Sequence, residues 1–455
     1  MARKLVIWGE IKTIRVMDGT IRIAESELLK VKELIAHPWR KTLLYIKALG
    51  PGLITGASDD DPSGIGTYSS VGAKFGLAIL WMAAWLLPIM LAVQEVCARI
   101  GIVTNKGLAG VLLEHYRKRI VMPAVLLLII ANVVNIGADI GAMAASLEML
   151  TGVNYYLAAI LFSVAILLLE VFVQYHLYVK FLKWLTLSVF AYIVTGFLIK
   201  PDWLDILKQS FIPQISISEE YIFAMIAVFG TTITPYLFFW QTSEEVEEDR
   251  LLKAGSDGPT IHQKIIRMRT DVNTGMILAN VVFFFIVLTT AQVLFKHGIT
   301  DIESAEQAAL ALKPLAGEHA YLLFAAGIIG TGLLAIPVLA GSGAYALAEI
   351  MEWQEGLELE FSQAKGFYLV IAFSIIVGLS LNFFHINPIT ALYYSAYLNG
   401  IISLPLLFVI MVVGNDPEIM GEETHPRYVK FFGWVAILFM AMAVIVSVLL
   451  LFYKR

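Results

Sequence analysis

The residues best suited to chemistry are a run of three carboxylates inside an apolar segment near the N-terminus, Asp59, Asp60 and Asp61. One aspartate at the centre of a membrane helix costs about 3 kcal/mol on insertion scales, so three are expected to face protein, water or a cation. The residues that follow weaken a helix, Pro62, Ser63 and Gly64. Because proline has no N–H, the carbonyl of Ser58 is expected to be freed at the same depth. Carboxylate and carbonyl oxygens together are hard ligands that suit a cation.

A second segment breaks in a corresponding place. Residues 230–236 read Gly-Thr-Thr-Ile-Thr-Pro-Tyr inside an apolar stretch at about 221–240. Counting five apolar spans from each break predicts two five-helix repeats, and the odd repeat length inverts the second copy. The pattern therefore predicts an inverted-repeat transporter whose site lies between two broken helices.

The composition places the chain among all-α polytopic membrane proteins. It has 455 residues, of which 58% are hydrophobic and 15% charged, and its mean hydropathy is +0.77. About eleven apolar windows are long enough to cross a hydrocarbon core of roughly 30 Å. They lie near residues 46–71, 77–99, 120–147, 155–175, 182–199, 221–240, 275–295, 320–349, 366–384, 389–413 and 429–452. The single cysteine, Cys97, excludes a disulfide framework and a cysteine-based metal cage.

The distribution of Lys and Arg predicts the orientation of the bundle. With the N-terminus inside, 25 of the 32 Lys and Arg residues fall in inside segments and 7 in outside segments. This asymmetry predicts a cytoplasmic N-terminus and an extracytoplasmic C-terminus. Residues 1–20 lack the apolar region of a signal peptide. The chain is expected to be a monomeric, multi-pass protein of the plasma membrane of a prokaryotic cell.

The chain is expected to have four parts. Residues 1–45 form a cytoplasmic appendage, with a hairpin around Asp18-Gly19 and an amphipathic helix from Ser26 to Ala36. The other parts are the two repeats and one additional helix, at 46–199, 221–413 and 429–452.

A second group of acids lies at the end of the sixth span, Glu244, Glu245, Glu247, Glu248 and Asp249. A solvated helix terminus accounts for these residues, and the alternative is a cytoplasmic cation vestibule that includes Glu244 and Glu245.

Two stretches and the second break resemble the Nramp family of divalent-metal transporters. They are GPGLITGASDDDPSG, GLAILWMAAWLLPIMLAVQEVCARIGIVTNKGLA and Gly-Thr-Thr-Ile-Thr-Pro-Tyr. The resemblance covers the first ten spans and is most specific over residues 50–110. It implies a leucine-transporter-type fold with broken helices one and six, and a carrier rather than an enzyme. In the family, an Asp and an Asn of helix one bind the metal with a Met and a carbonyl of helix six.

Carried over by position, the resemblance implies a metal site made of the Asp61 carboxylate and two carbonyls, those of Ser58 and Thr231. Further candidate ligands are Thr234 and Asp60, and Asp59 is an alternative to Asp60 that the sequence leaves open. This chain departs from the family at three positions, because Asn is replaced by Gly64, Met by Thr234 and His by Tyr236.

These departures change the expected cargo. A thioether is a soft ligand that favours Mn²⁺, Fe²⁺ or Cd²⁺ over Mg²⁺, whereas the hydroxyl of Thr234 is hard. Gly64 and Thr234 are also expected to leave more room, which suits Mg²⁺ because it dehydrates reluctantly. The pattern resembles the Nramp-related magnesium transporters that lack the Met. The predicted cargo is Mg²⁺, with Mn²⁺ also carried, and no separate cofactor is expected.

Proton-handling positions of the family also differ here. Of the Asp and Glu of its helix three, the Glu falls on Asp139 and the Asp on Ile136. The positions nearest its helix-nine arginines are Lys365 and Gly366. With Tyr236 in place of His, transport is expected to be uncoupled from protons, and Asp139 and Tyr236 are the residues through which a proton path would run.

Three other functions remain open. The first is a proton-coupled importer of Mn²⁺ or Fe²⁺, and the second is a sodium-coupled carrier of an organic solute on the same fold. The third is an intramembrane hydrolase with paired aspartates, which needs a second carboxylate opposite Asp61. The expected partners are divalent metal ions and the lipid bilayer, and no nucleic acid.

Overall fold

A computed structural model describes residues 51–173, 187–253, 260–357 and 359–453. These residues are almost wholly helical, and no β-strand occurs among them. The expected appendage at 1–45, with its hairpin and amphipathic helix, lies outside the described residues. The boundaries of the four predicted parts stay predictions.

Both predicted helix breaks are confirmed. Helix α3 (Pro51–Asp59) ends within the aspartate run, and two residues separate it from α4 (Pro62–Phe75). In the second break, α12 (Glu219–Thr232) ends before Ile233 and α13 (Pro235–Lys253) follows. Each second half begins with proline at a position where its missing N–H is not needed. The prolines therefore divide each span into two helices.

Nine helical segments of the described residues are long and apolar enough to cross a membrane. Their main helices are α5 (Trp81–Thr104), α7 (Lys118–Thr151), α8 (Tyr155–Phe172), α12 with α13, α14 (Ile261–Val293), α17 (Ala320–Met351), α18 (Lys365–Leu381), α19 (Pro388–Asn415) and α21 (Arg427–Tyr453). The count becomes ten when Leu187–Leu198 and Trp203–Phe211, which are bent by 119°, form one span. The eleventh predicted span is α3 and α4, whose 9 and 14 residues are separately too short to cross.

Shorter helices connect these segments. They are α6 (Leu108–His115), α10 (Ala191–Leu198), α11 (Trp203–Phe211), α15 (Ala305–Ala309), α16 (Lys313–Ala316) and α20 (Pro417–Met420). The 3₁₀ turns are η1 (Gly76–Ile79), η2 (Leu187–Phe190), η3 (Phe295–His297), η4 (Leu310–Leu312), η5 (Gly317–His319), η6 (Asn382–Phe384) and η7 (Gly421–Glu423).

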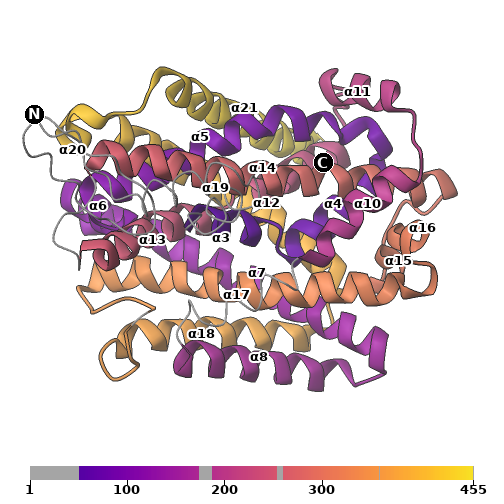
Figure 1. Cartoon of the computed structure of the whole chain (residues 1–455), viewed down its shortest axis with the longest axis horizontal. Helices are drawn as coiled ribbons and strands as arrows, with labels where there is room; N and C mark the ends of the chain where they lie inside the picture. Colours follow the sequence, from indigo (N-terminus) through magenta and orange to yellow (C-terminus); the bar gives the residue numbers. More distant parts are fainter. Residues whose placement is uncertain (1–50, 174–186, 254–259, 358, 454–455) are drawn as a thin grey trace, which may run out of the picture. The chain divides into compact units, whose positions relative to one another are not determined.

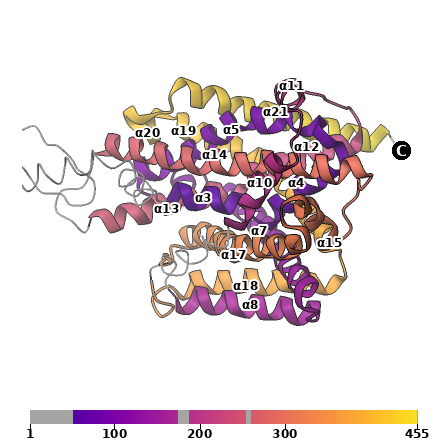
Figure 2. The same cartoon turned by 45° about the vertical axis from the view of Figure 1, so that its right-hand side comes forward.

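The broken helices lie in the middle of the bundle. In Figures 1 and 2, α8 and α18 lie along one edge next to α17, and α5, α19 and α21 lie on the opposite side of α3 and α4. Helix α3 packs mainly on α14, α12 packs mainly on α19, and α7 packs on α17, α18 and α19. The two breaks are therefore enclosed by α7, α14 and α19.

Helix α3 is fixed closely to α14. A Cβ atom added to Gly56 would lie 2.4 Å from the backbone of Gly275, so only glycines allow this approach. At the start of α3, the Asp271 carboxylate accepts hydrogen bonds from the N–H groups of Gly52 at 2.7 Å and Leu53 at 3.2 Å. A carboxylate from α14 thus caps the amino end of α3.

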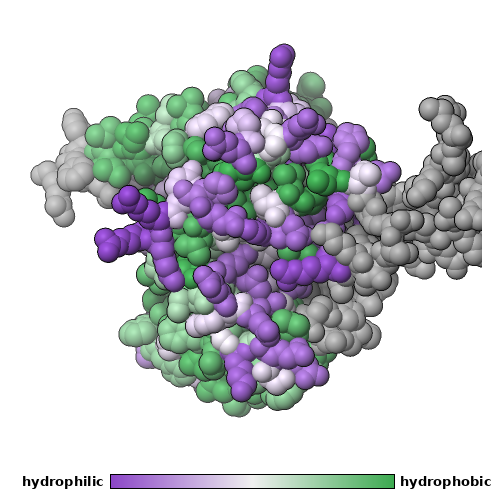
Figure 3. Space-filling model, turned by 90° about the vertical axis from the view of Figure 1, so that its left-hand side faces the viewer, coloured by the Kyte–Doolittle hydropathy of each residue, from purple (hydrophilic) through white to green (hydrophobic). Residues whose placement is uncertain are grey.

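Polar segments gather at the ends of the helices. Helices α6, α13 and α20 mark one end of the bundle, and α11, α15 and α16 mark the other (Figure 1). Figure 3 shows hydrophilic residues across the first end, with hydrophobic residues on its flanks. Segments predicted to lie inside and outside therefore occupy opposite ends, while the side of the membrane that each faces stays a prediction.

Candidate functional site

Asp61 is the N-cap of α4, and both oxygens of its carboxylate accept hydrogen bonds. One oxygen accepts hydrogen bonds from the N–H of Gly64 and the hydroxyl of Ser63, both at 2.7 Å. The other oxygen accepts from the Asn135 amide at 3.1 Å. The side chain is only 1% exposed. The amino end of α4 and the neighbouring amide therefore stabilise a buried negative charge.

Asn135 connects Asp61 to a second carboxylate. The same amide nitrogen donates to Asp139 at 3.0 Å, one turn further along α7. The Asn135 carbonyl oxygen accepts from the Asn399 amide of α19 at 3.0 Å. All four residues are buried. The break in helix one is thus joined through one side chain to α7 and α19.

The second break meets the first directly. The Tyr236 hydroxyl, at the start of α13, donates to the carbonyl of Ser58 at 2.9 Å. The hydroxyls of Ser63 and Thr231 lie 3.3 Å apart. Predicted site residues from both broken helices, Ser58, Asp61, Thr231 and Tyr236, are therefore brought together. The carbonyl of Ser58, which is a predicted metal ligand, already accepts one hydrogen bond, from the Tyr236 hydroxyl.

Several buried oxygens at the breaks have no hydrogen-bond partner among the described residues. They are both carboxylate oxygens of Asp59, one of Asp60, one of Asp139, and the hydroxyls of Ser58 and Thr234. Leaving such a group without a partner costs about 1–3 kcal/mol, and more for a charge. All of them are hard oxygen ligands. No three His, Cys, Asp or Glu side chains within the described ranges are arranged to hold a metal ion, so a site here would rely on carbonyls and hydroxyls as well.

Neighbouring groups lie close to Gly64. A Cβ atom added there would lie 3.1 Å from the carbonyl oxygen of Asp59 and 3.4 Å from the ring of Tyr68. The hydroxyl of Thr231 would follow at 3.5 Å. The first distance is tight for a Cβ atom and the other two are ordinary van der Waals contacts, so the expectation of extra room for the ion stays a prediction. The hardness of the oxygens is the other argument for a hard cation.

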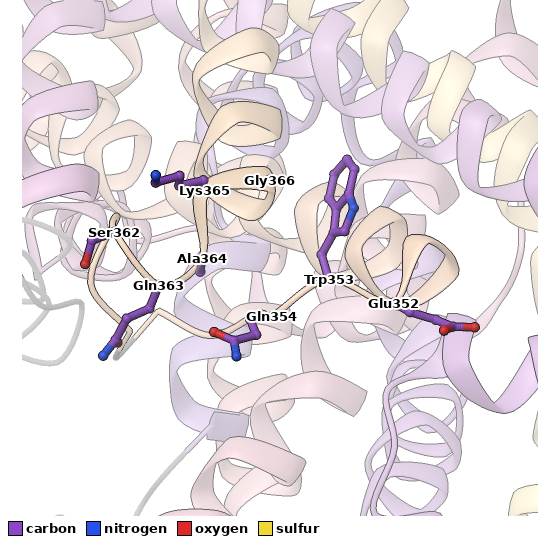
Figure 4. A pocket seen from close by; sticks show the side chains of 8 residues that line it. All are labelled: Glu352, Trp353, Gln354, Ser362, Gln363, Ala364, Lys365 and Gly366. Atoms are coloured by element: carbon purple, nitrogen blue, oxygen red, sulfur yellow. The ribbon is translucent and has the colours of Figure 1, made fainter.

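The remaining proton-path positions are separated from one another. Asp139 and Ile136 are fully buried on α7. Lys365 is exposed at the start of α18 and lines a surface pocket with Trp353 and Gln363 (Figure 4). That pocket lies in the connection between α17 and α18, away from the breaks. Lys365 therefore does not supply a cation beside Asp139.

The acids of α13 are paired rather than simply solvated. The Glu245 carboxylate is 6% exposed and accepts from the Gln241 amide at 2.9 Å. Two other acids contact bases of α14, in the pairs Asp249 with Lys264 and Glu248 with Arg267. The solvated-terminus interpretation is wrong for Glu245 and Asp249, which are only 6% and 7% exposed. The role of Glu244 and Glu245 as a vestibule stays a prediction.

Asn135 was recognisable from the sequence as a hydrogen-bond partner of Asp139, because its spacing of four places both on one face of a helix. Sequence reasoning overlooked two other residues that support the site. Asn399 of α19 reaches Asn135, and Asp271 of α14 reaches the start of α3. The residues of these contacts are 264 and 219 positions apart in the sequence, and no local pattern marks them.

Comparison with known proteins identifies what the chain resembles. A family model described as natural resistance-associated macrophage protein-like, or Nramp, matches residues 52–450. The divalent metal cation transporter MntH of Erwinia tasmaniensis is 26% identical over 396 residues, which cover 85% of this chain and 90% of that protein.

Solved structures share the fold. The Eremococcus coleocola manganese transporter, in complex with an aromatic bis-isothiourea compound, matches with a TM-score of 0.68 at 18% identity, covering 90% of this chain and 86% of that one. MHP1, a nucleobase-cation-symport-1 family transporter in a closed conformation, matches with a TM-score of 0.50 at 13% identity, covering 88% and 92%. The predicted fold with two broken helices is confirmed.

Asn135→Leu should destabilise the protein more than a matched change elsewhere. The variant removes the donor shared by Asp61 and Asp139 and leaves both carboxylates buried, so we expect a loss of about 1–3 kcal/mol. The unfolding midpoint of purified protein in detergent measures this loss. The control is Asn280→Leu on α14, a buried amide whose oxygen has no partner within the described residues. Equal midpoints for the two variants would contradict the bridging role of Asn135.

Proposed function

The chain belongs to the Nramp family and is a divalent-metal transporter of that family, and we propose that it carries Mg²⁺ and Mn²⁺ by alternating access without proton coupling. The carrying observation is the set of buried, unpartnered oxygens at the two helix breaks, contributed by Ser58, Asp59, Asp60 and Thr234. Oxygen ligands favour hard cations, and Mg²⁺ and Mn²⁺ both accept carboxylate, carbonyl and water ligands. No sulfur atom stands at Thr234, where the family has methionine.

We assign the following roles to the site residues. The Asp61 carboxylate contacts the ion with the carbonyls of Ser58 and Thr231, and Asp60 and Thr234 contribute oxygens directly or through water. Asp61 keeps lone-pair directions available because a carboxylate accepts about four contacts, of which the protein uses three. Gly64 contributes its N–H to Asp61 and no ligand atom.

The contacts between the half-helices support alternating access. Helices α3 and α13 are joined by Thr55, whose hydroxyl donates to Gln241 at 2.6 Å, and Gln241 in turn donates to Glu245. Helices α4 and α12 are joined by the contact between Ser63 and Thr231. Each pair of halves therefore forms a unit on its own side of the breaks. We infer that the units tilt alternately about the site, with the breaks as hinges.

The sodium-coupled carrier of an organic solute is less compatible with this site. Such a carrier uses a free helix amino end to hold the substrate carboxylate. Here the amino end of α4 is capped by the protein's own Asp61. The cytoplasmic N-terminus, the extracytoplasmic C-terminus and the monomeric state stay predictions.

Liposomes containing the purified protein should take up both Mg²⁺ and Mn²⁺, and each ion should compete with the other. Asp61→Ala should abolish uptake, because neutral dipoles cannot replace the hydration that a divalent ion loses. Ion-sensitive dyes inside the liposomes report both fluxes. Glu170→Gln on α8 is the control, since it changes a buried carboxylate outside the breaks. Uptake of Mn²⁺ with no entry or competition by Mg²⁺ would contradict the proposed cargo.

Thr234→Met should shift the preference from Mg²⁺ toward Cd²⁺ and Mn²⁺, because a thioether is a soft ligand. We expect the ratio of Cd²⁺ to Mg²⁺ affinities, measured by calorimetry, to rise by about tenfold or more, which corresponds to about 1.4 kcal/mol. Thr234→Val is the matched control, since it removes the hydroxyl without adding sulfur. If the ratio of Cd²⁺ to Mg²⁺ affinities is the same in Thr234→Met and Thr234→Val, the side chain of Thr234 does not determine selectivity.

Metal uptake should leave the proton concentration inside the liposomes unchanged. An inside-negative potential contributes about 2.3 kcal/mol per charge per 100 mV, so a divalent ion gains about 4.6 kcal/mol on entry without a coupled proton. A pH-sensitive dye in the lumen checks this during Mn²⁺ uptake. Metal-dependent acidification that Asp139→Asn removes, with metal binding retained, would instead support the proton-coupled alternative.

A further inference from the structure

The three consecutive aspartates differ sharply in their surroundings. Asp61 accepts three hydrogen bonds from protein groups. Asp59 is equally buried, at 1% exposed, yet neither of its carboxylate oxygens has a partner among the described residues. Asp60 is 7% exposed, and its buried oxygen also lacks a partner among the described residues. Asp59 is thus the more deeply buried of the two carboxylates that lack protein donors.

The ends of the broken helix increase this difference. Asp59 is the last residue of α3, where unpaired carbonyls give the helix end a partial negative charge. Asp61 lies at the amino end of α4, where the partial charge is positive. The backbone therefore stabilises a charge on Asp61 and destabilises one on Asp59. A carboxylate buried at a carboxyl end can therefore be charged only when a cation from another source accompanies it, and is otherwise protonated.

No protein cation supplies this charge within the described part of the chain. Among the described residues, none of the salt bridges involves Asp59, Asp60 or Asp61. Asp59 instead interacts electrostatically with the neighbouring aspartates and with the hydroxyls of Tyr68 and Tyr236. Those groups either repel a negative charge or are neutral. The adjoining Ser58 hydroxyl also lacks a partner.

We propose that the Asp59 carboxylate is a direct ligand of the transported divalent cation and forms with Asp61 a pair whose charge balances that of the ion. The inference rests on the proposed function and adds a residue that lies outside the set assigned there. Two carboxylates and one divalent ion form a neutral group, which costs far less to enclose in a low-dielectric interior than an unbalanced charge. Asp61 is held in place by protein donors, whereas both oxygens of Asp59 are available to the ion.

This arrangement predicts opposite effects on stability and on binding. Without metal, Asp59→Asn replaces a buried carboxyl group that has no protein donor by a neutral amide of similar size, so the unfolding midpoint should stay the same or rise. The same variant should weaken Mg²⁺ and Mn²⁺ binding by about a hundredfold, at the upper end of losses for groups that support a metal site. A residue with only a structural role would lower the midpoint and leave the affinity unchanged.

The experiment is calorimetric titration of Mg²⁺ and Mn²⁺ into wild type, Asp59→Asn, Asp60→Asn and the control Glu170→Gln, with unfolding midpoints measured without metal. We expect Asp59→Asn to lose more affinity than Asp60→Asn, and Glu170→Gln to bind as wild type does. Asp59→Glu, which keeps the charge, should recover part of the affinity and tests the proposal if Asp59→Asn does not fold.

The outcomes separate the two proposals. Wild-type protein that binds neither Mg²⁺ nor Mn²⁺ would overturn the proposed function. Wild-type binding with an affinity of Asp59→Asn within twofold of wild type would overturn only the role of Asp59. A greater loss of metal affinity in Asp60→Asn than in Asp59→Asn would also overturn this role. So would an Asp59→Glu variant that binds metal no better than Asp59→Asn does.

Discussion

The structure depends on one constraint, which is that a carboxylate inside a membrane bundle must be balanced by donors or by a cation. Asp61 meets this constraint through the amino end of α4, the Ser63 hydroxyl and the Asn135 amide. Asp59 has no partner within the described residues and lies at the carboxyl end of α3. The break in helix one thus places a carboxylate with protein donors and one without them within three residues. The bound cation of our proposal balances the charge of the second, Asp59.

The same break connects the site to the rest of the bundle. Asn135 joins Asp61 to α7 and α19, and the Tyr236 hydroxyl joins the two broken helices at Ser58. Asp271 on α14 holds the far end of α3. An ion that binds at Asp61 therefore acts on groups that are linked to α7, α13, α14 and α19. This linkage gives a physical route from ion binding to movement of the half-helices.

Local sequence chemistry predicted the parts of the site that depend on neighbours along the chain. Asp61-Pro62 and Thr234-Pro235 mark the two breaks, because proline ends one helix and begins the next. Two broken helices within a bundle of apolar helices were sufficient to predict the fold class. The count of about eleven spans exceeds the nine or ten long apolar helices because α3 and α4 are separately short.

Contacts between distant segments were not predictable in this way. Tyr236 and Ser58 are 178 residues apart, and nothing near either residue indicates the other. The unequal environments of Asp59 and Asp61 depend on which side of the break each carboxylate falls. The space beside Gly64 depends on Tyr68 and on the Asp59 carbonyl, which a substitution pattern does not reveal. The covered acids of α13 likewise depend on α14.

The central claim is that a divalent cation binds between the two helix breaks. Anomalous diffraction from crystals of the full chain grown with Mn²⁺ locates such an ion directly. The account predicts one strong peak in contact with carboxylate oxygens of Asp59 and Asp61, and a weaker peak when excess Mg²⁺ is added. A peak confined to the acids of α13, with none between the breaks, would contradict it.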